Sequence, residues 1–224
     1  MGDSLSLMFD DPPYRLSGIV YGTLLNQREA LERIGDAASQ PPYKAAPKAP
    51  VLYVKPRNTL SGSGQSMAIP EQVDALRVGA TLGLVIGRAA SRVAPAEALA
   101  HVAGVTLIAD LSVPHDSFYR PSVRFVARDG SCVIGPRIVP LSEVGDPNAV
   151  SIAVRIDGEP RQTASMAGMI RPAAQLLSDV TEFMTLLPGD VLMLGVCAGM
   201  AQVRQGQRFE ISAEGIGQLQ GAIV

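Results

Sequence analysis

Glycine and proline divide this chain into short apolar runs, and that punctuation limits the folds it can adopt. The sequence holds 22 Gly and 17 Pro among 224 residues. Few segments show the long 3.6-residue periodicity of helices, whereas short apolar runs between turn residues are typical of β-strands. We therefore predict a mainly β (α+β) fold with a few short helices.

The composition argues against several classes of protein. The formal net charge is only -2, and charged residues make up 18% of the chain, which is poor for a surface that must neutralise nucleic-acid phosphates. Cys132 and Cys197 lack a CxxC or Cys/His spacing, so we expect free thiols rather than zinc or a disulfide. No apolar run is long enough to span a membrane, and residues 1–14 lack the basic start of a secretory signal. We expect a cytoplasmic protein with no membrane or nucleic-acid partner.

Three regions are expected along the chain. Residues 1–17 are predicted to be a flexible tail. Residues 18–50 are expected to form a small strand and helix unit that ends in a loop, because four prolines fall among the twelve residues 39–50 and disfavour regular structure. Residues 51–224 are expected to form the main domain.

Within these regions the pattern predicts strands and a smaller number of helices. The expected strands cover residues 18–25, 51–54, 82–86, 105–109, 133–139, 150–156, 190–195 and 208–212, and the expected helices cover 28–38, 95–102 and part of 169–187. Asp157-Gly158 is predicted to close a hairpin. Asp110 is expected at the end of its strand.

Several segments, taken in order, resemble the fumarylacetoacetate hydrolase superfamily. They are Tyr53–Pro56, Leu84–Gly87, Gly104–Ser112, Ile134–Pro136 and Leu187–Leu192. Within that superfamily, Pro42–Lys44, Lys55–Thr59, Gly79–Thr81 and Ser117–Pro121 are similar to the N-terminal halves or subunits of the bifunctional isomerase/decarboxylases of 4-hydroxyphenylacetate degradation. The resemblance implies a rolled β-sheet core and substrates that are unsaturated 2-oxo or 2-hydroxy dicarboxylic acids.

The resemblance also implies a metal site that this chain has largely lost. Family members hold Mg²⁺ or Mn²⁺ with three acids, and Asp110 matches the third of them. The other two are usually Glu, but Gly79 and Thr81 stand in their places. Because Mg²⁺ prefers hard oxygen ligands such as carboxylates, we expect no metal to be bound tightly by this chain. Both residues also have a purely structural interpretation. Asp110 would then be a capping or turn residue after its strand, and Thr81 would pack in the core.

Other side chains are candidates for catalysis and substrate binding. We take Asp110 and His115 as candidate catalytic residues, with His115 as the better acid or base and an exposed loop histidine as the alternative. Lys55, Arg57 and Arg120 are candidates for binding substrate carboxylates, for which Arg has a suitable bidentate geometry. Surface salt bridges are the alternative role for these cations. Whether His115 or Asp116 replaces the missing ligands stays open.

Two functions follow from the resemblance. In the first, the chain is a subunit of a decarboxylase/isomerase that acts on 5-carboxymethyl-2-oxo-hex-3-ene-1,7-dioate and 2-hydroxyhepta-2,4-diene-1,7-dioate. In the second, it is a noncatalytic or dicarboxylate-binding homologue that stabilises an active sister subunit. The Lys that often stands three positions before Asp129 in the family is Val126 here. The family's Gly-Thr-Pro is replaced by Gly195-Val196-Cys197. Both losses favour the second function. Either function implies a homodimer or a hetero-oligomer with a metal-binding homologue.

Overall fold

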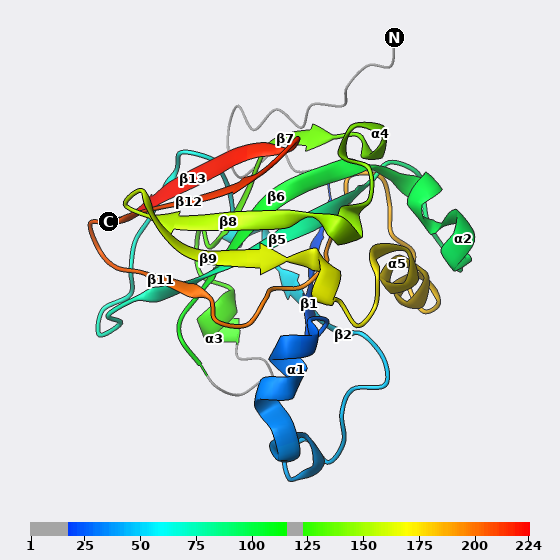
Figure 1. Cartoon of the computed structure of the whole chain (residues 1–224), viewed down its shortest axis with the longest axis horizontal. Helices are drawn as coiled ribbons and strands as arrows, with labels where there is room; N and C mark the ends of the chain where they lie inside the picture. Colours follow the sequence, from blue (N-terminus) through cyan, green and yellow to red (C-terminus); the bar gives the residue numbers. More distant parts are fainter. Residues whose placement is uncertain (1–17, 116–122) are drawn as a thin grey trace.

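The computed structural model describes residues 18–115 and 123–224, which form two β-sheets with short helices around them (Figure 1). The larger sheet has eight strands in the order β2-β1-β10-β5-β6-β7-β3, with β11 paired to β5. Its strands are β1 (Val20–Leu24), β2 (Val51–Lys55), β3 (Leu60–Gly62), β5 (Leu76–Ile86), β6 (Val102–Ser112), β7 (Cys132–Val139), β10 (Val191–Met193) and β11 (Ala201–Val203).

The smaller sheet has five strands in the order β4-β13-β12-β8-β9. They are β4 (Ser66–Met67), β8 (Ser151–Ile156), β9 (Glu159–Ser165), β12 (Arg208–Ala213) and β13 (Gly217–Ile223). The hairpin between β8 and β9 turns at Asp157 and Gly158, both with positive φ (51° and 83°), as the Asp-Gly pair predicted.

The helices are short. The α-helices are α1 (Arg28–Ile34), α2 (Pro95–Ala98), α3 (Val123–Val126), α4 (Leu141–Val144) and α5 (Ala173–Thr181), and the 3-10 turns cover Gly35–Ser39, Arg57–Thr59, Leu99–His101, Pro147–Ala149 and Met166–Gly168. Within the described part of the chain, no helix has both the length and the apolar character needed to cross a membrane.

The core lies on both faces of the larger sheet. On one face, Leu82 and Leu84 of β5 belong to the same buried cluster as Ile152 of β8 and Ile211 of β12. Val85 belongs to a second buried cluster on the opposite face. A strand that is buried on both sides has no need of alternating polar residues, which explains the continuous apolar run at 82–86.

The fold class is confirmed, but several element boundaries differ from the prediction. Strands β5 and β6 each run for 11 residues, so Asp110 lies inside β6 and not at the end of its strand. The helix expected within 169–187 is only α5, and the helix expected over 28–38 changes to a 3-10 turn at Gly35.

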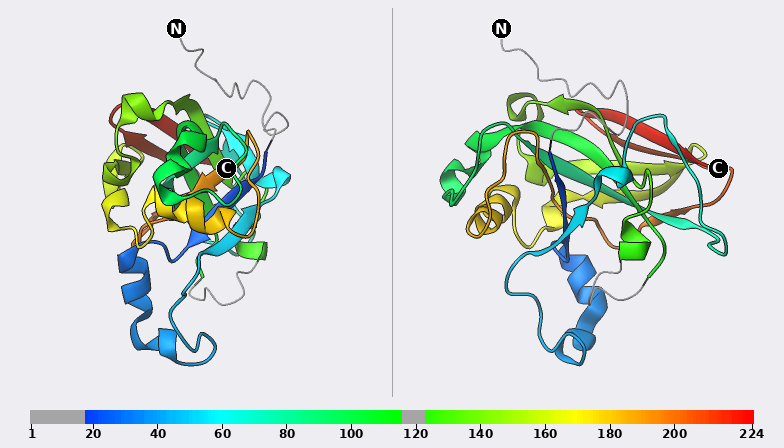
Figure 2. Two further views of the ribbon diagram at one scale, coloured as in Figure 1. Left: turned by 90° about the vertical axis from the view of Figure 1, so that its right-hand side faces the viewer. Right: turned by 180° about the vertical axis from the view of Figure 1, so that it is seen from behind.

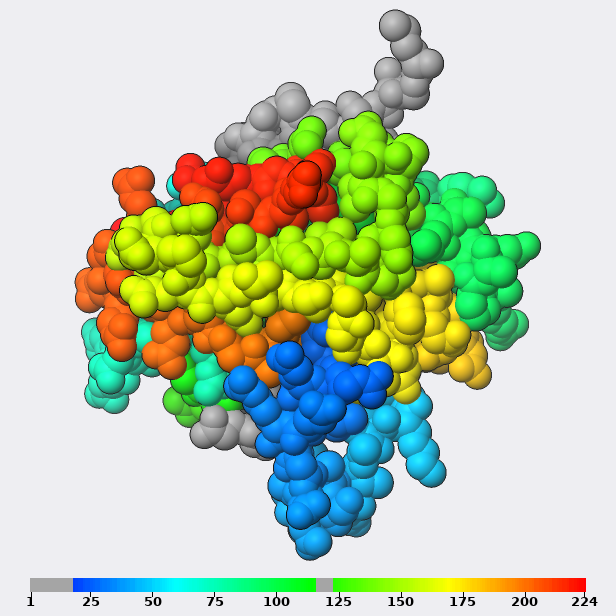
Figure 3. Space-filling view, in the orientation of Figure 1, coloured from blue at the N-terminus to red at the C-terminus, as the bar shows by residue number. Residues whose placement is uncertain are grey.

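Residues 18–50 contribute to the larger sheet and then leave it. Strand β1 lies between β2 and β10 in that sheet. The residues that follow, 28–50, are called the arm here. Figures 2 and 3 show the arm, in blue, projecting from the body of the molecule. None of the residues of α1 or of the 3-10 turn after it is fully buried.

Candidate functional site

The positions that match the family's metal ligands meet at the centre of the larger sheet. Gly79 of β5 pairs with Asp110 of β6, and Asp110 pairs on its other side with Cys132 of β7. Thr81 lies two residues beyond Gly79 on β5, on the same side of that strand because side chains alternate along a strand. The fold therefore brings these positions together as the resemblance implies.

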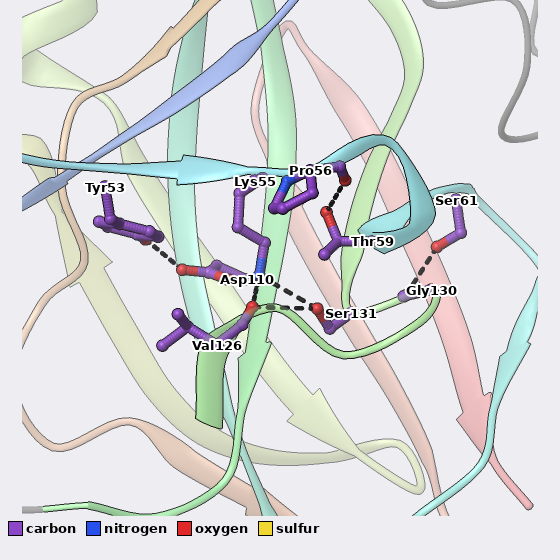
Figure 4. A network of polar contacts seen from close by, with 9 residues as sticks. All are labelled: Tyr53, Lys55, Pro56, Thr59, Ser61, Asp110, Val126, Gly130 and Ser131. Carbon is purple, nitrogen blue, oxygen red and sulfur yellow. Dashed lines mark hydrogen bonds and ion pairs between the residues drawn. The ribbon is translucent and has the colours of Figure 1, made fainter. Parts of the chain in front are cut away.

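Asp110 is fully engaged by protein groups (Figure 4). The ammonium Nζ of Lys55 lies 2.7 Å from its Oδ1, and the Tyr53 hydroxyl donates to its Oδ2. Lys55 also donates to Ser131 Oγ at 3.1 Å and to the carbonyl of Val126. Asp110 is only 6% exposed and Lys55 only 1%. The result is a buried ion pair whose ammonium has three protein acceptors.

The sequence of β2 explains how this pair forms. Tyr53 and Lys55 are two residues apart on an extended strand, so their side chains leave the same face. That face points toward Asp110 on β6, as Figure 4 shows. A charge that is removed from water must be paired and hydrogen-bonded to be tolerated, and Lys55 and Asp110 satisfy each other in this way.

The neighbours of the pair are held in their neutral forms. Burial raises the pKa of Tyr53 well above its usual value, and the charge of Asp110 raises it further. Burial also raises the pKa of the Cys132 thiol from 9.0 to about 12; Lys55 opposes this shift and Asp110 adds to it. At neutral pH, Tyr53 is therefore a hydrogen-bond donor and Cys132 is not a nucleophile.

The places of the two family Glu residues are filled by other atoms. A Cβ on Gly79 would lie 2.8 Å from Cγ1 of Val196 and 2.9 Å from the carbonyl oxygen of Asp110. Thr81 is fully buried, and its Oγ1 donates to the carbonyl of Gly195 at 2.8 Å. Thr81 thus ties β5 to the 195–200 loop, and Val196 occupies the space beside Gly79.

The side chains at this centre do not suit a divalent cation as ligands. Mg²⁺ is normally held by one or two carboxylates plus water and substrate oxygens, but the Asp110 carboxylate at this centre is already paired with an ammonium. Across residues 18–115 and 123–224, no group of three or more His, Cys, Asp or Glu side chains is placed to hold a metal. The chemistry of the residues present therefore argues against a metal at Asp110.

Arg57 and His115, the other predicted site residues that the structure describes, come from the segments that follow β2 and β6. Arg57 is exposed in the 3-10 turn after β2. His115 follows β6, with its Nδ1 2.8 Å from the carbonyl oxygen of Val113 and its ring stacked on Phe125 at 5.5 Å. Arg120 and Asp116 lie outside the described residues. Roles for these side chains in catalysis or binding stay predictions.

A pocket of about 540 Å³ opens between the arm and the body, and His115 lines it. Among the described residues, the lining is Leu24, Leu25, Ala30, Arg33, Ile34, Ala37, Tyr43, Arg77, His115, Val196, Cys197, Ala198, Gly199, Met200 and Gln202. Sequence reasoning missed Arg33 and Arg77, because a single Arg on a helix or strand carries no motif. Val196 lines this pocket and also fills the space beside Gly79. The pocket therefore lies next to the position of the first family Glu.

This fold and centre define the class of protein. A family model described as fumarylacetoacetate (FAA) hydrolase C-terminal matches residues 19–224. The chain belongs to the fumarylacetoacetate hydrolase family.

Individual relatives narrow the comparison. Over 209 residues the chain is 38% identical to the 4-hydroxyphenylacetate degradation bifunctional isomerase/decarboxylase of Escherichia coli, with 93% of this chain and 48% of that protein aligned. The chain spans about half the length of the bifunctional relatives that it matches. This confirms the similarity to that branch of the family.

Solved structures agree with this placement. The chain is 28% identical to 5-carboxymethyl-2-hydroxymuconate delta-isomerase from Mycobacterium smegmatis, with a TM-score of 0.78 over 93% of this chain and 79% of the other. Fumarylpyruvate hydrolase from Pseudomonas aeruginosa, solved with Mn²⁺ and pyruvate, gives a TM-score of 0.80 at 24% identity, covering 100% of this chain and 97% of the other. The second comparison supports the fold.

Proposed function

We propose that this chain is the metal-poor unit of a two-unit decarboxylase/isomerase in 4-hydroxyphenylacetate catabolism. The complete enzyme would act on 5-carboxymethyl-2-oxo-hex-3-ene-1,7-dioate and 2-hydroxyhepta-2,4-diene-1,7-dioate. A homologous unit that retains the acids would hold the cation, and this chain would stabilise it. The similarity to bifunctional isomerase/decarboxylases of about twice the length supports the proposal.

The observation that carries the proposal is the Lys55–Asp110 ion pair. In a metal-dependent member, a divalent cation beside this acid polarises substrate oxygens and stabilises developing negative charge. Here the Lys55 ammonium lies 2.7 Å from Asp110 and has further acceptors in Ser131 and Val126. An ammonium that is buried and saturated by protein acceptors has no donor left for a substrate. In this proposal the centre supports the fold and takes no part in the chemistry.

One observation favours a second candidate, in which the chain itself turns over a substrate. His115 lines the pocket beside the arm, and histidine is the side chain that enzymes use most often as a general acid or base. In that case His115, and not Asp110, would move the proton in the tautomerisation. The two candidates differ in whether the isolated chain has activity.

A reconstitution assay separates them. The purified chain is incubated with the triacid substrate and Mg²⁺, alone and after mixing with a homologue that retains the Glu pair. The proposal predicts no turnover by the chain alone, and a stable complex in which the homologue gains activity or thermal stability. Metal-dependent turnover by the isolated chain would refute it. Turnover that is independent of metal and lost in His115→Gln would support the second candidate instead.

A further inference from the structure

A second pocket lies beside the segment that supplies acceptors to Lys55. Its volume of about 470 Å³ falls within the range of roughly 300 to 1,000 Å³ that is usual for small-molecule sites. We call it the β4–α3 pocket, because its walls come from β4 with the next residue and from α3 with the turn that follows. Among the described residues it is lined by Ser66, Met67, Ala68, Arg124, Ala127, Arg128, Asp129 and Gly130. It shares no lining residue with the pocket beside the arm.

Two arginines of the β4–α3 pocket stand side by side without an acid partner. Arg124 and Arg128 are four positions apart, a spacing that places side chains on one face of a helical turn. The turn is helical here, because the Ala127 N–H donates to the carbonyl of Val123 at 2.8 Å. In the part of the chain that the structure describes, neither arginine forms an ion pair. Like charges at this spacing repel each other, so an anion bound between them would be stabilising.

The donors of these arginines are available to a ligand. Arg124 lies over the ring of Phe125, with its Cζ 5.2 Å from the ring centroid, and this cation–π contact helps to order the side chain. Arg128 is half-buried. Neither guanidinium donates a hydrogen bond to a residue within 18–115 or 123–224, and the backbone N–H groups of Arg128 and Asp129 have no acceptor there either. The pocket is therefore rich in unused donors.

One acid also lines the pocket and restricts the ligand further. Asp129 is exposed, and Asn58 donates to its Oδ1 at 2.6 Å. Its Oδ2 accepts no hydrogen bond from the described residues. An ionised carboxylate is an acceptor only, so it favours a ligand that carries hydroxyl groups beside its anionic group. Acidic side chains bind sugar hydroxyls in this way in dinucleotide sites. The hydroxyl of Ser66, which is also exposed, adds a group that can donate or accept.

Charge and shape favour a phosphate over a carboxylate as the anionic group. A single guanidinium satisfies a carboxylate through two parallel hydrogen bonds. A phosphomonoester carries a charge of about −1.5 to −2 at pH 7 and has three acceptor oxygens, so it can use two guanidinium groups at once. The apolar part of the lining is limited to Met67, Ala68 and Ala127, which disfavours a long hydrocarbon stem.

We propose that the β4–α3 pocket binds the phosphate monoester of a small sugar, with Arg124 and Arg128 holding the phosphate and Asp129 accepting from the sugar hydroxyls. Neither Lys55 nor Asp110 lines this pocket. The inference goes beyond the proposed function, because the site lies in this chain alone and needs no homologous unit, no metal ion and no substrate of the family.

A ligand in this pocket would contact the segment that closes the buried ion pair. Val126 and Ser131 both accept hydrogen bonds from Lys55, and Gly130, beside Ser131, lines the pocket. Figure 4 shows these three residues along one segment next to Lys55. A ligand that binds only the folded chain stabilises it by mass action. Binding should therefore raise the unfolding temperature as well as give a calorimetric signal.

Calorimetric titration of the full chain with glucose-6-phosphate at low salt tests the inference. We expect saturable binding of glucose-6-phosphate, weaker binding of inorganic phosphate and none of glucose. Arg128→Gln should weaken the binding of glucose-6-phosphate by roughly 10-fold, because hydrogen bonds to charged groups are strong. Arg124→Gln should cause a smaller loss, since Arg124 is exposed and solvent and salt screen its charge. Arg88→Gln is the matched control, because Arg88 is exposed and does not line the pocket.

A second variant tests the role of the acid. Asp129→Ala removes the acceptor for the sugar but also a negative charge that opposes the phosphate. It should therefore reduce or abolish the preference for glucose-6-phosphate over inorganic phosphate, while inorganic phosphate binds at least as tightly as before. The ratio of the two affinities measures this effect separately from any general loss of binding.

Three results would overturn the inference. The first is the absence of saturable binding of glucose-6-phosphate at millimolar concentrations. The second is unchanged binding in both Arg128→Gln and Arg124→Gln, when their thermal unfolding matches that of the unmodified chain. The third is equal affinity for glucose-6-phosphate and inorganic phosphate in the unmodified chain, which would remove the sugar from the proposed ligand. The homologous unit takes no part in these titrations, so the proposed function stands or falls separately.

Discussion

Replacing Lys55 by Met should destabilise the chain far more than replacing an exposed lysine. The Met side chain keeps most of the aliphatic stem but removes the ammonium that lies 2.7 Å from Asp110. Among the described residues, the buried Asp110 carboxylate would then keep only Tyr53 as a side-chain donor, and Ser131 Oγ and the Val126 carbonyl would each lose the bond from Lys55 while keeping the bond between them. Breaking a buried ion pair on one side costs about 3–5 kcal/mol.

This cost is large enough for a thermal measurement. For a chain of this length, 1 kcal/mol shifts the unfolding temperature by roughly 2–4 °C, so Lys55→Met should lower it by roughly 6–20 °C. Lys48→Met is the control, because Lys48 is exposed in the arm and surface substitutions usually change stability by about 0.5 kcal/mol or less.

A double-mutant cycle then assigns the loss to the pair. Asp110→Asn removes the carboxylate charge, so Lys55→Met combined with Asp110→Asn should be more stable than the sum of the single losses predicts, by about 1 kcal/mol or more. Urea unfolding of the four proteins gives this coupling energy. Additive losses, or a loss below about 1 kcal/mol in Lys55→Met, would show that the ion pair is not a stabilising element of the centre.

Three further predictions concern the same region. Tyr53→Phe removes one donor to the Asp110 carboxylate and should cost about 1.5–3 kcal/mol in urea unfolding. Thr81→Val removes the hydroxyl that donates to Gly195 and should cost about 0.5–1.5 kcal/mol; an increase in stability would contradict the assigned contact. Because the pKa of the Cys132 thiol is raised from 9.0 to about 12 in the folded chain, the folded state binds more protons between these values. The stability from the neutral thiol is therefore complete below about pH 9 and is lost as the pH rises toward 12, so Cys132→Ala should flatten the alkaline decline of the unfolding free energy. If the unfolding free energy of Cys132→Ala fell with alkaline pH as steeply as that of the unmodified chain, this would argue against the raised pKa of the Cys132 thiol.

The fold was largely predictable because its strands leave local signals. Residues 82–86 and 133–139 are apolar runs between turn residues, and both lie in strands of the larger sheet. The full lengths of β5 and β6 were missed, because Gly79 and Asp110 interrupt the apolar pattern while the ladder between them continues. Pairing across a sheet is a non-local property, and a single sequence does not display it.

The candidate site was predictable only in part. The loss of the acids at Gly79 and Thr81 is visible in the sequence, and so is the family position of Asp110. The pairing of Lys55 with Asp110 is not visible in the sequence. The two residues lie 55 positions apart, and only the order of the strands brings them together. The pocket residues Arg33 and Arg77 come from a helix and a strand that the sequence gives no reason to bring together.

Manganese binding tests the central claim most directly. The claim is that the Lys55 ammonium, and no divalent cation, balances the charge of Asp110. Titration of the purified chain with Mn²⁺, followed by electron paramagnetic resonance of the free ion, should show no stoichiometric site, and Asp110→Asn should behave like the unmodified chain. Stoichiometric binding of Mn²⁺ that is lost in Asp110→Asn would contradict the account.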